Sequence, residues 1–117
     1  MRMLPSAARL RRRSDFGRVY AKGRSYATDL IVVYVLPGRG RTTRVGFSVS
    51  RKLGKSVVRN RTRRRLREGV RPLLSNINGR YDVIVVAKRK SAEATLADLR
   101  TALDELFRRS GILGAAS

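Results

Sequence analysis

Arginine is the residue type with the most distinctive chemistry in this sequence. The chain of 117 residues holds 28 Lys and Arg against 8 Asp and Glu, a formal net charge of +20. Between positions 39 and 71, thirteen basic residues accompany one acidic residue, Glu68. A guanidinium offers a planar fork of donors that matches phosphate oxygens and stacks on bases. The run therefore predicts a polyanionic partner, either RNA or an anionic membrane.

The basic run includes a segment with helical periodicity, and this periodicity favours RNA. On a helix over 57–71 one side is apolar and consists of Val58, Thr62, Leu66, Val70 and Leu73. The other side carries Asn60, Arg61, Arg64, Arg67, Glu68 and Arg71, with Arg63 and Arg65 flanking the apolar stripe. A membrane-surface helix would give its apolar side to lipid, whereas this helix needs that side for the core. A face that only meets water is the weaker alternative, because like charges four apart repel each other.

Missing residue types exclude most enzyme chemistry within the chain. The sequence has no Cys and no His, so it lacks disulfides, thiolate nucleophiles and the commonest metal ligand and general base. Its carboxylates are scattered, and it has no Gly-rich nucleotide loop. We therefore expect no catalytic residue, no metal ligand set and no small-molecule cofactor in the protein itself.

The hydrophobic pattern predicts a soluble, cytoplasmic protein without a membrane partner. The longest apolar run, 30–36, falls far short of the about 20 residues that a membrane-spanning helix needs. No apolar stretch follows the Arg-rich N-terminus, so it does not resemble a signal peptide.

Aromatic side chains form a second candidate site. Phe16 and Tyr20 are four residues apart on a predicted helix, and Tyr34 lies in a predicted strand. Ser48 and Ser50 belong to a strand face of small residues that would let a ligand approach closely. These rings could stack on single-stranded bases. They could equally be core residues, and the pattern alone leaves both possibilities open.

The periodicities predict a single α/β (α+β) domain over 1–117 with the order α-β-β-α-β-α. Ser14 is expected to cap the first helix, Gly23 to end it, Ser56 to cap the second helix and Pro72 to end it. The predicted elements are a helix from 14 to about 22, one or two strands in 24–36, a strand in 43–50, a helix from 57 to about 71, a buried central strand over 81–87 and a helix from 95 to 109. We expect a mobile basic arm at 1–13 and a flexible tail at 112–117.

The stretch from Gly46 to Glu68 resembles the signature of the protein subunit of bacterial ribonuclease P. Its centre is Arg59-Asn60-Arg61, the RNR motif of that family. The resemblance extends from about residue 9 to 108. It includes Arg9-Leu10, Asp15-Phe16, Val19 and Gly23 upstream, and Tyr81-Asp82 with the following strand and Leu-rich helix downstream. The sequence departs from the family mainly in carrying Arg at 51, 63 and 65, where members often have Lys, and Tyr at 20, where they often have Phe.

The resemblance implies a fold and a mechanism. The fold would be a sandwich with a small mixed sheet of three to four strands and a left-handed β-α-β crossover, against the usual handedness. The catalyst would be a partner RNA that uses Mg²⁺, and the protein would help it to remove the 5′ leader of precursor tRNA.

The resemblance also implies two sets of site residues. The RNA-subunit surface would comprise Arg51, Lys52, Lys55, Arg59, Asn60, Arg61, Arg63, Arg64 and Arg67. The leader-binding cleft would comprise Phe16, Tyr20, Tyr34, Ser48 and Ser50. Two other functions remain as alternatives: a structural or chaperone-like RNA binder of the ribosomal-protein type, and a nuclease in its own right that would depend on a carboxylate such as Asp82.

Overall fold

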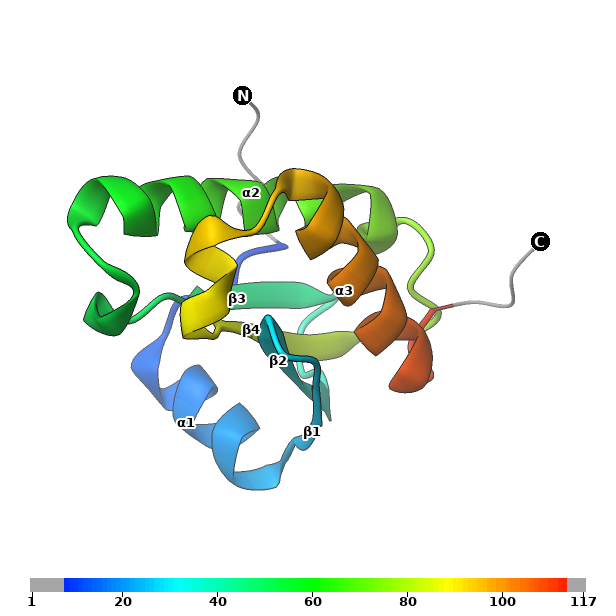
Figure 1. The fold of residues 1–117 in the computed structure, drawn as a ribbon. Helices are drawn as coiled ribbons and strands as arrows, with labels where there is room; N and C mark the ends of the chain where they lie inside the picture. The colour runs from blue at the N-terminus through cyan, green and yellow to red at the C-terminus, as the bar shows by residue number, and fades with distance from the viewer. Residues whose placement is uncertain (1–7, 114–117) are drawn as a thin grey trace.

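A computed structural model of the chain describes residues 8–113. Its sheet has four strands in the order β1-β2-β4-β3, with α2 and α3 on one face and α1 on the other (Figure 1). The elements in chain order are α1 (Arg13–Lys22), β1 (Arg24–Ala27), β2 (Ile31–Pro37), β3 (Arg44–Ser48), η2 (Arg51–Leu53), α2 (Ser56–Leu74), β4 (Tyr81–Ala87), η3 (Arg89–Glu93) and α3 (Leu96–Arg109). The predicted fold class and element order are confirmed, with two strands in the 24–37 region.

Strand β4 is the centre of the sheet. It pairs antiparallel with β2 and parallel with β3, while β1 extends the sheet beyond β2. Because β4 has a strand on each side and helices over both faces, its residues are apolar in near-continuous order, as the sequence predicts. The parallel pairing of β3 with β4 requires a crossover, and α2 provides it.

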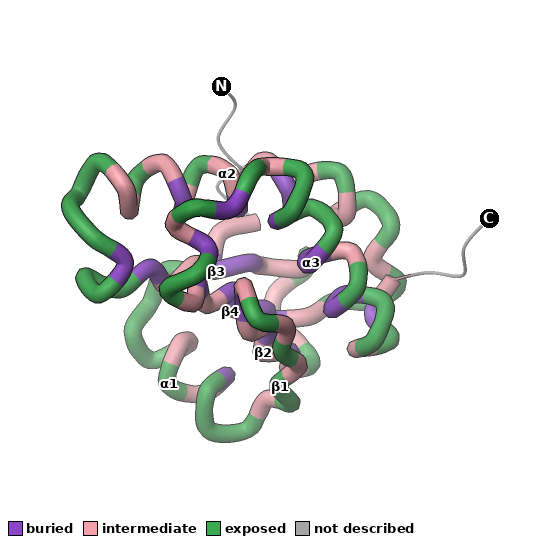
Figure 2. Tube along the Cα trace, in the orientation of Figure 1, coloured by how far each residue is buried: buried purple, intermediate pink, exposed green. Residues whose placement is uncertain are grey.

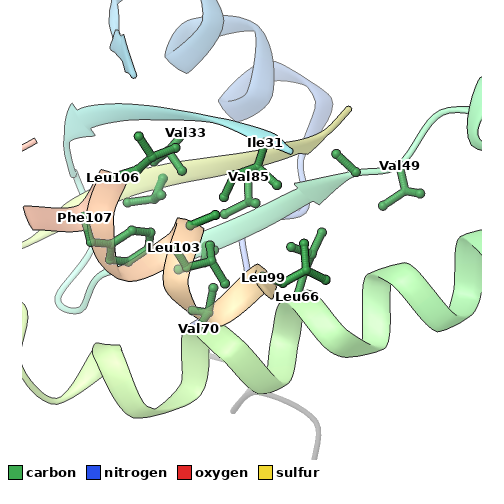
Figure 3. Close-up of a cluster of buried hydrophobic side chains, with 14 of the residues drawn as sticks. Ile31, Val33, Val49, Leu66, Val70, Val85, Leu99, Leu103, Leu106 and Phe107 are labelled. Atoms are coloured by element: carbon green, nitrogen blue, oxygen red, sulfur yellow. The ribbon is translucent and has the colours of Figure 1, made fainter. Parts of the chain in front are cut away.

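The larger core lies between the sheet and the pair α2 and α3. Leu66 and Val70 of α2 meet Leu99 and Leu103 of α3 over strand residues such as Val85, and all five are fully buried (Figure 3). Buried positions are concentrated on the strands and the inner sides of these helices (Figure 2). The apolar stripe predicted for α2 is therefore the side that fixes the helix, which leaves its other sides for charged residues.

The helix ends differ from the sequence prediction. Helix α2 runs from Ser56 to Leu74 with Lys55 at the N-cap, so Ser56 does not cap it. Pro72 lies inside the last turn and does not end the helix. An exposed proline near a helix end removes one hydrogen bond, whereas Leu73 and Leu74 beyond it still pack against the core. Similarly, α1 begins at Arg13 with Arg12 at the N-cap, not at Ser14.

Parts of the predicted arm and of the predicted tail belong to the fold. Leu10 is buried and donates its N–H to the carbonyl of Val45 at 3.0 Å, and Arg9 forms a bridge with the same strand. At the other end Ile112 is buried and its carbonyl accepts from Asn78 N–H at 2.8 Å. Hydrophobic burial thus places both segments in the fold. The rest of the predicted arm, 1–7, and of the tail, 114–117, lies outside the described residues.

A buried carboxylate holds α1 against the sheet. Asp82 of β4 has no exposed side-chain surface, and it accepts from Nε and Nη2 of Arg44 at 3.0 and 2.9 Å and from Nη2 of Arg18 on α1. Asp15 lies 3.5 Å from both guanidiniums. Burial alone would raise the pKa of Asp82, but the hydrogen bonds from Arg44 and Arg18 outweigh burial and hold this pKa below its usual value. The same contact with Asp82 raises the pKa of Arg44.

The first prediction concerns this buried carboxylate. Asp82→Asn leaves two guanidiniums without their buried partner and should lower the free energy of unfolding at pH 7 by about 3 kcal/mol. The matched control is Asp104→Asn, which breaks an exposed pair with Arg108 on α3 and should cost at most about 0.5 kcal/mol. Urea unfolding of the three proteins measures both effects.

The loss of stability in Asp82→Asn depends on pH, and the direction of this dependence follows from the pKa of Asp82. A carboxylate whose pKa is depressed by folding stabilises the protein above its unfolded pKa of about 3.9, and this stabilisation is lost as the pH falls through the lower, folded pKa. The gap between the parent and Asp82→Asn should therefore shrink only in acid. A gap that instead closed between pH 5 and 8 would contradict the assignment.

A second prediction concerns the contact between α2 and α3. A Cβ at Gly69 would lie 2.6 Å from Cδ1 of buried Leu103, whereas a Cβ at Gly17 on α1 meets nothing within 4 Å. Gly69→Ala should destabilise the fold by about 1–3 kcal/mol through overpacking. Gly17→Ala should stabilise it by about 0.5–1 kcal/mol, because alanine is the better helix former. The melting temperature should fall in Gly69→Ala and rise in Gly17→Ala. Equal shifts in the two variants would rule out the close packing at Gly69.

Candidate nucleic-acid interface

The arginines of α2 point in three directions around the helix. Thr62 and Leu66 face the core, which fixes the rotation of the helix. Asn60 and Arg64 are exposed on the opposite side. Between these sides, Arg63 and Arg67 turn towards the edge of β3, and Arg61 and Arg65 turn towards η3. The RNR motif is therefore not one uniform row of solvent-facing charge.

The pair that turns towards η3 contacts protein backbone. Arg61 donates from Nη2 to the carbonyl of Ala92 at 3.2 Å, and Arg65 donates from Nη1 to the carbonyl of Ala94 at 2.7 Å. The sequence placed Arg61 among the outward residues of α2, but the structure directs its guanidinium into the fold. The carbonyls that receive these bonds are far from α2 in sequence, so no periodicity could have indicated them.

The segment before α2 carries exposed cations. Arg51 and Lys52 lie on η2 and Lys55 precedes α2, and all three are exposed. Arg59, at the start of the helix, donates from Nε to the carbonyl of Gly54 at 3.3 Å. Gly54 has φ of +138°, which only glycine adopts readily, and it allows the sharp turn between η2 and α2. These predicted residues form one continuous basic stretch with Asn60 and Arg64.

Two further cations were missed by the sequence analysis. Arg89 and Lys90 are exposed on η3, which contacts η2. Their signal in the sequence is the run of three basic residues, Lys88 to Lys90, directly after the central strand. Lys88 differs from them because its ammonium donates to the carbonyl of Thr28 at 2.6 Å.

The predicted aromatic residues come together beside α1. The ring centroids of Phe16 and Tyr20 are 6.2 Å apart, and those of Tyr20 and Tyr34 are 4.9 Å apart with the rings nearly perpendicular. Tyr20 is 40% exposed, so its ring is available to a partner. Phe16 and Tyr34 are half-buried against a small second core that includes Val19 and Ile84. Both roles that the sequence left open, core and surface, are thus combined in one cluster.

The small-residue face of β3 is only partly bare. Phe16 covers Gly46 so closely that a Cβ there would lie 2.8 Å from its Cε1. Ser48, in the next row of the sheet with Val86 and Val32, is half-buried. Ser50 lies beyond the strand, where its hydroxyl accepts from Lys52 N–H at 3.3 Å and caps η2. The structure therefore groups Ser48, but not Ser50, with the face that carries the aromatic cluster.

A hollow of about 320 Å³ joins the aromatic and basic residues at the edge of β3. Phe16, Phe47, Arg63 and Arg67 line it together with the N-terminal segment that includes Arg9. Burial and the neighbouring charges of Arg63 and Arg9 lower the pKa of Arg67. Positive charge is thus crowded around a concave surface of nucleotide size, and an anion there would relieve the repulsion.

The described residues supply neither a membrane span nor a metal ligand cluster. No helix within 8–113 is long and apolar enough to cross a bilayer. In the same part of the chain no three Asp or Glu side chains come together as ligands for a metal ion.

Comparisons with known proteins agree with this geometry. The family described as Ribonuclease P matches residues 4–111. The ribonuclease P protein component of Symbiobacterium thermophilum is 46% identical over 111 residues, which cover 94% of this chain and 96% of that protein. The corresponding protein of Caldanaerobacter subterraneus is 41% identical over 92% of this chain and 93% of its own length.

Solved structures show the same fold. The RNase P protein of Staphylococcus aureus superposes with a TM-score of 0.84 at 32% identity, and the match covers 93% of this chain and all of that one. The RNase P protein of Thermotoga maritima gives a TM-score of 0.77 at 30% identity over 86% of this chain and 96% of its own. Because sequence and fold agree over nearly the whole chain, this protein belongs to the bacterial ribonuclease P protein family, whose members are subunits of a tRNA-processing endoribonuclease.

Proposed function

We propose that this subunit binds the catalytic RNA of ribonuclease P with its basic surface and the 5′ leader of precursor tRNA with its aromatic cluster. The observation that carries this proposal is the hollow at the β3 edge, where Phe16 and the crowded cations Arg63 and Arg67 line one concave surface. A single-stranded segment that leaves a structured RNA needs both features at one place: donors for phosphates and rings for unstacked bases.

The basic surface for the RNA subunit consists of exposed residues on α2, η2 and the loop between them. Its exposed members are Arg51, Lys52, Lys55, Asn60 and Arg64, and the half-buried Arg59 lies among them. The ion pairs seen on α2 are confined to its far end, where Glu68 meets Arg71 at 3.2 Å. Phosphates that lie against this face relieve the repulsion between its like charges, and the counterions that the RNA releases favour binding.

The aromatic cluster fits the leader. Tyr20 offers an exposed ring held in place by Tyr34 and Phe16, so stacking of a base on it costs little conformational entropy. Mature tRNA has no leader and cannot make this contact. The cluster therefore favours the substrate over the product of the cleavage.

Mg²⁺ enters this proposal through the RNA and not through the protein. The carboxylates of the described residues do not assemble a site for the ion, and Asp82 is fully committed to Arg18 and Arg44. The contribution of the protein is electrostatic. Its guanidiniums neutralise crowded phosphates where RNA subunit and substrate meet, which lowers the concentration of Mg²⁺ that the complex needs.

Reconstitution tests the function as a whole. The protein is mixed with a bacterial ribonuclease P RNA and a leader-bearing precursor tRNA at low Mg²⁺, and 5′ cleavage is scored with each component omitted in turn. We expect cleavage to require the RNA and to rise strongly with the protein. Tight RNA binding without any effect on cleavage would instead support the chaperone-like alternative, and cleavage by the bare protein would support a nuclease.

A third prediction tests the basic surface. Arg64→Gln should reduce the slope of log K against log salt for RNA-subunit binding by roughly 0.7–0.9, the change expected for one lost phosphate contact. The control is Arg108→Gln on α3, a helix with three acidic and three basic residues, where Arg108 pairs with Asp104; it should leave the slope unchanged. Equal slopes for all three proteins would remove α2 from the RNA interface.

A fourth prediction tests the aromatic cluster. Tyr20→Ala should weaken binding of precursor tRNA to the holoenzyme by about 1–3 kcal/mol, the usual value of one stacked base, and leave mature tRNA binding unchanged. Tyr20→Phe keeps the ring and should behave like the parent. If the alanine variant lost affinity for both tRNAs equally, the ring would not be a leader contact.

A further inference from the structure

We infer that Arg61 and Arg65 are positioning residues that clamp the η3 segment onto α2, and that they do not themselves contact RNA. The inference rests on the proposed RNA-binding function, because it divides the α2 arginines into those that meet phosphates and those that hold a neighbouring basic turn. It reassigns the second arginine of the RNR motif, which the sequence pattern placed on the RNA side.

The guanidiniums of Arg61 and Arg65 both reach the η3 segment. Arg61 and Arg65 are four residues apart and so lie above one another on one side of α2. Both donate to backbone carbonyls of a single short segment, Ala92 at 3.2 Å and Ala94 at 2.7 Å. These carbonyls lie at the end of a 3-10 turn, where backbone oxygens lack helical donors, so the arginines supply the missing bonds.

Part of the Arg61 side chain is buried. Nε of Arg61 is buried and has no hydrogen-bond partner, so this side of the guanidinium is withdrawn from solvent. Within the η3 segment, Ser91 and Ala94 are 1% and 5% exposed, and Ser91 donates its hydroxyl to the carbonyl of Lys88 at 2.6 Å. A guanidinium in this position is committed to the fold, whereas Arg64, one turn away on the outer side, is exposed.

The clamped segment carries exposed cations. Arg89 and Lys90 are exposed at its start, and η3 packs against η2, which carries Arg51 and Lys52. Lys90 lies 3.5 Å from Asp29, and both side chains remain more than 70% exposed. The clamp therefore sets the position of one group of surface cations relative to the outer face of α2. An RNA that contacts both the η3 cations and the outer face of α2 would require their relative positions to be fixed.

The test compares Arg61→Gln with Arg64→Gln in binding to the RNA subunit across a salt series. We expect Arg64→Gln to lower the log–log slope by roughly 0.7–0.9 whether or not Arg89 is present, whereas Arg61→Gln should lower it only through the displaced cations of η3 and so have little further effect once Arg89 is changed to Gln. Hydrogen exchange of the amides of 88–94 should become at least about tenfold faster in Arg61→Gln and remain unchanged in Arg64→Gln.

A double-mutant cycle separates positioning from general loss of stability. Adding Arg89→Gln should weaken RNA binding less in the Arg61→Gln background than in the parent, because the turn is already displaced. In the Arg64→Gln background, Arg89→Gln should have its full effect. A uniformly less stable protein would show no such selective coupling.

The outcomes are distinguishable. The inference is overturned if Arg61→Gln lowers the salt slope as much as Arg64→Gln while exchange at 88–94 stays slow, or if Arg89→Gln is additive with Arg61→Gln. If Arg64→Gln leaves the slope unchanged, the proposed RNA-binding face is wrong. Should Arg61→Gln fail to fold, the same measurements on Arg65→Gln, which loses only the Ala94 contact, decide the question.

Discussion

The buried carboxylate of Asp82 is the interaction on which the positions of the functional residues depend. Helix α1 has only a small apolar contact with its face of the sheet, centred on Val19 and Ile84. Arg18 of α1 and Arg44 of β3 meet at Asp82 of β4, so one carboxylate joins three elements. The bond fixes how α1 lies over the sheet, and with it the positions of Phe16 and the rings around it. A chain with so few acids uses one of them in the interior, where each hydrogen bond to the charge is strong.

Helix α2 shows how one element can serve several purposes when its rotation is fixed. Its buried side meets α3, its outer side carries Arg64, one flank lines the hollow with Arg63 and Arg67, and the other flank holds η3. In such a helix, neighbouring arginines have unlike environments although they are identical in the sequence. The burial that lowers the pKa of Arg67 and the contact between Arg61 and a backbone carbonyl are both consequences of position around the axis.

Local sequence predicted the elements well, because periodicity and turn residues act within a few positions of each other. The central strand, the Leu-rich last helix and the helical spacing of Phe16 and Tyr20 follow from such signals, whereas the grouping of these rings with Tyr34 was implied by the family resemblance. The failures concern contacts between distant segments. Pro72 stays inside α2 because the leucines beyond it reach the core, Leu10 joins β3, Phe16 covers Gly46, and Arg61 reaches Ala92. None of these pairs has a spacing that a pattern within one element could indicate.

The pairing of the N-terminal segment with β3 has a consequence for the protein on its own. Strand β3 is an edge of the sheet, and an open edge offers unpaired amides and carbonyls to any other extended chain. Arg9 bridges to Val45 on this edge, and Leu10 satisfies the carbonyl of Val45. The segment therefore covers part of this edge and disfavours pairing between the β3 strands of two copies. Proteolysis between Leu10 and α1 would free the edge. The protein would then be more prone to aggregate when its positive charge is neutralised.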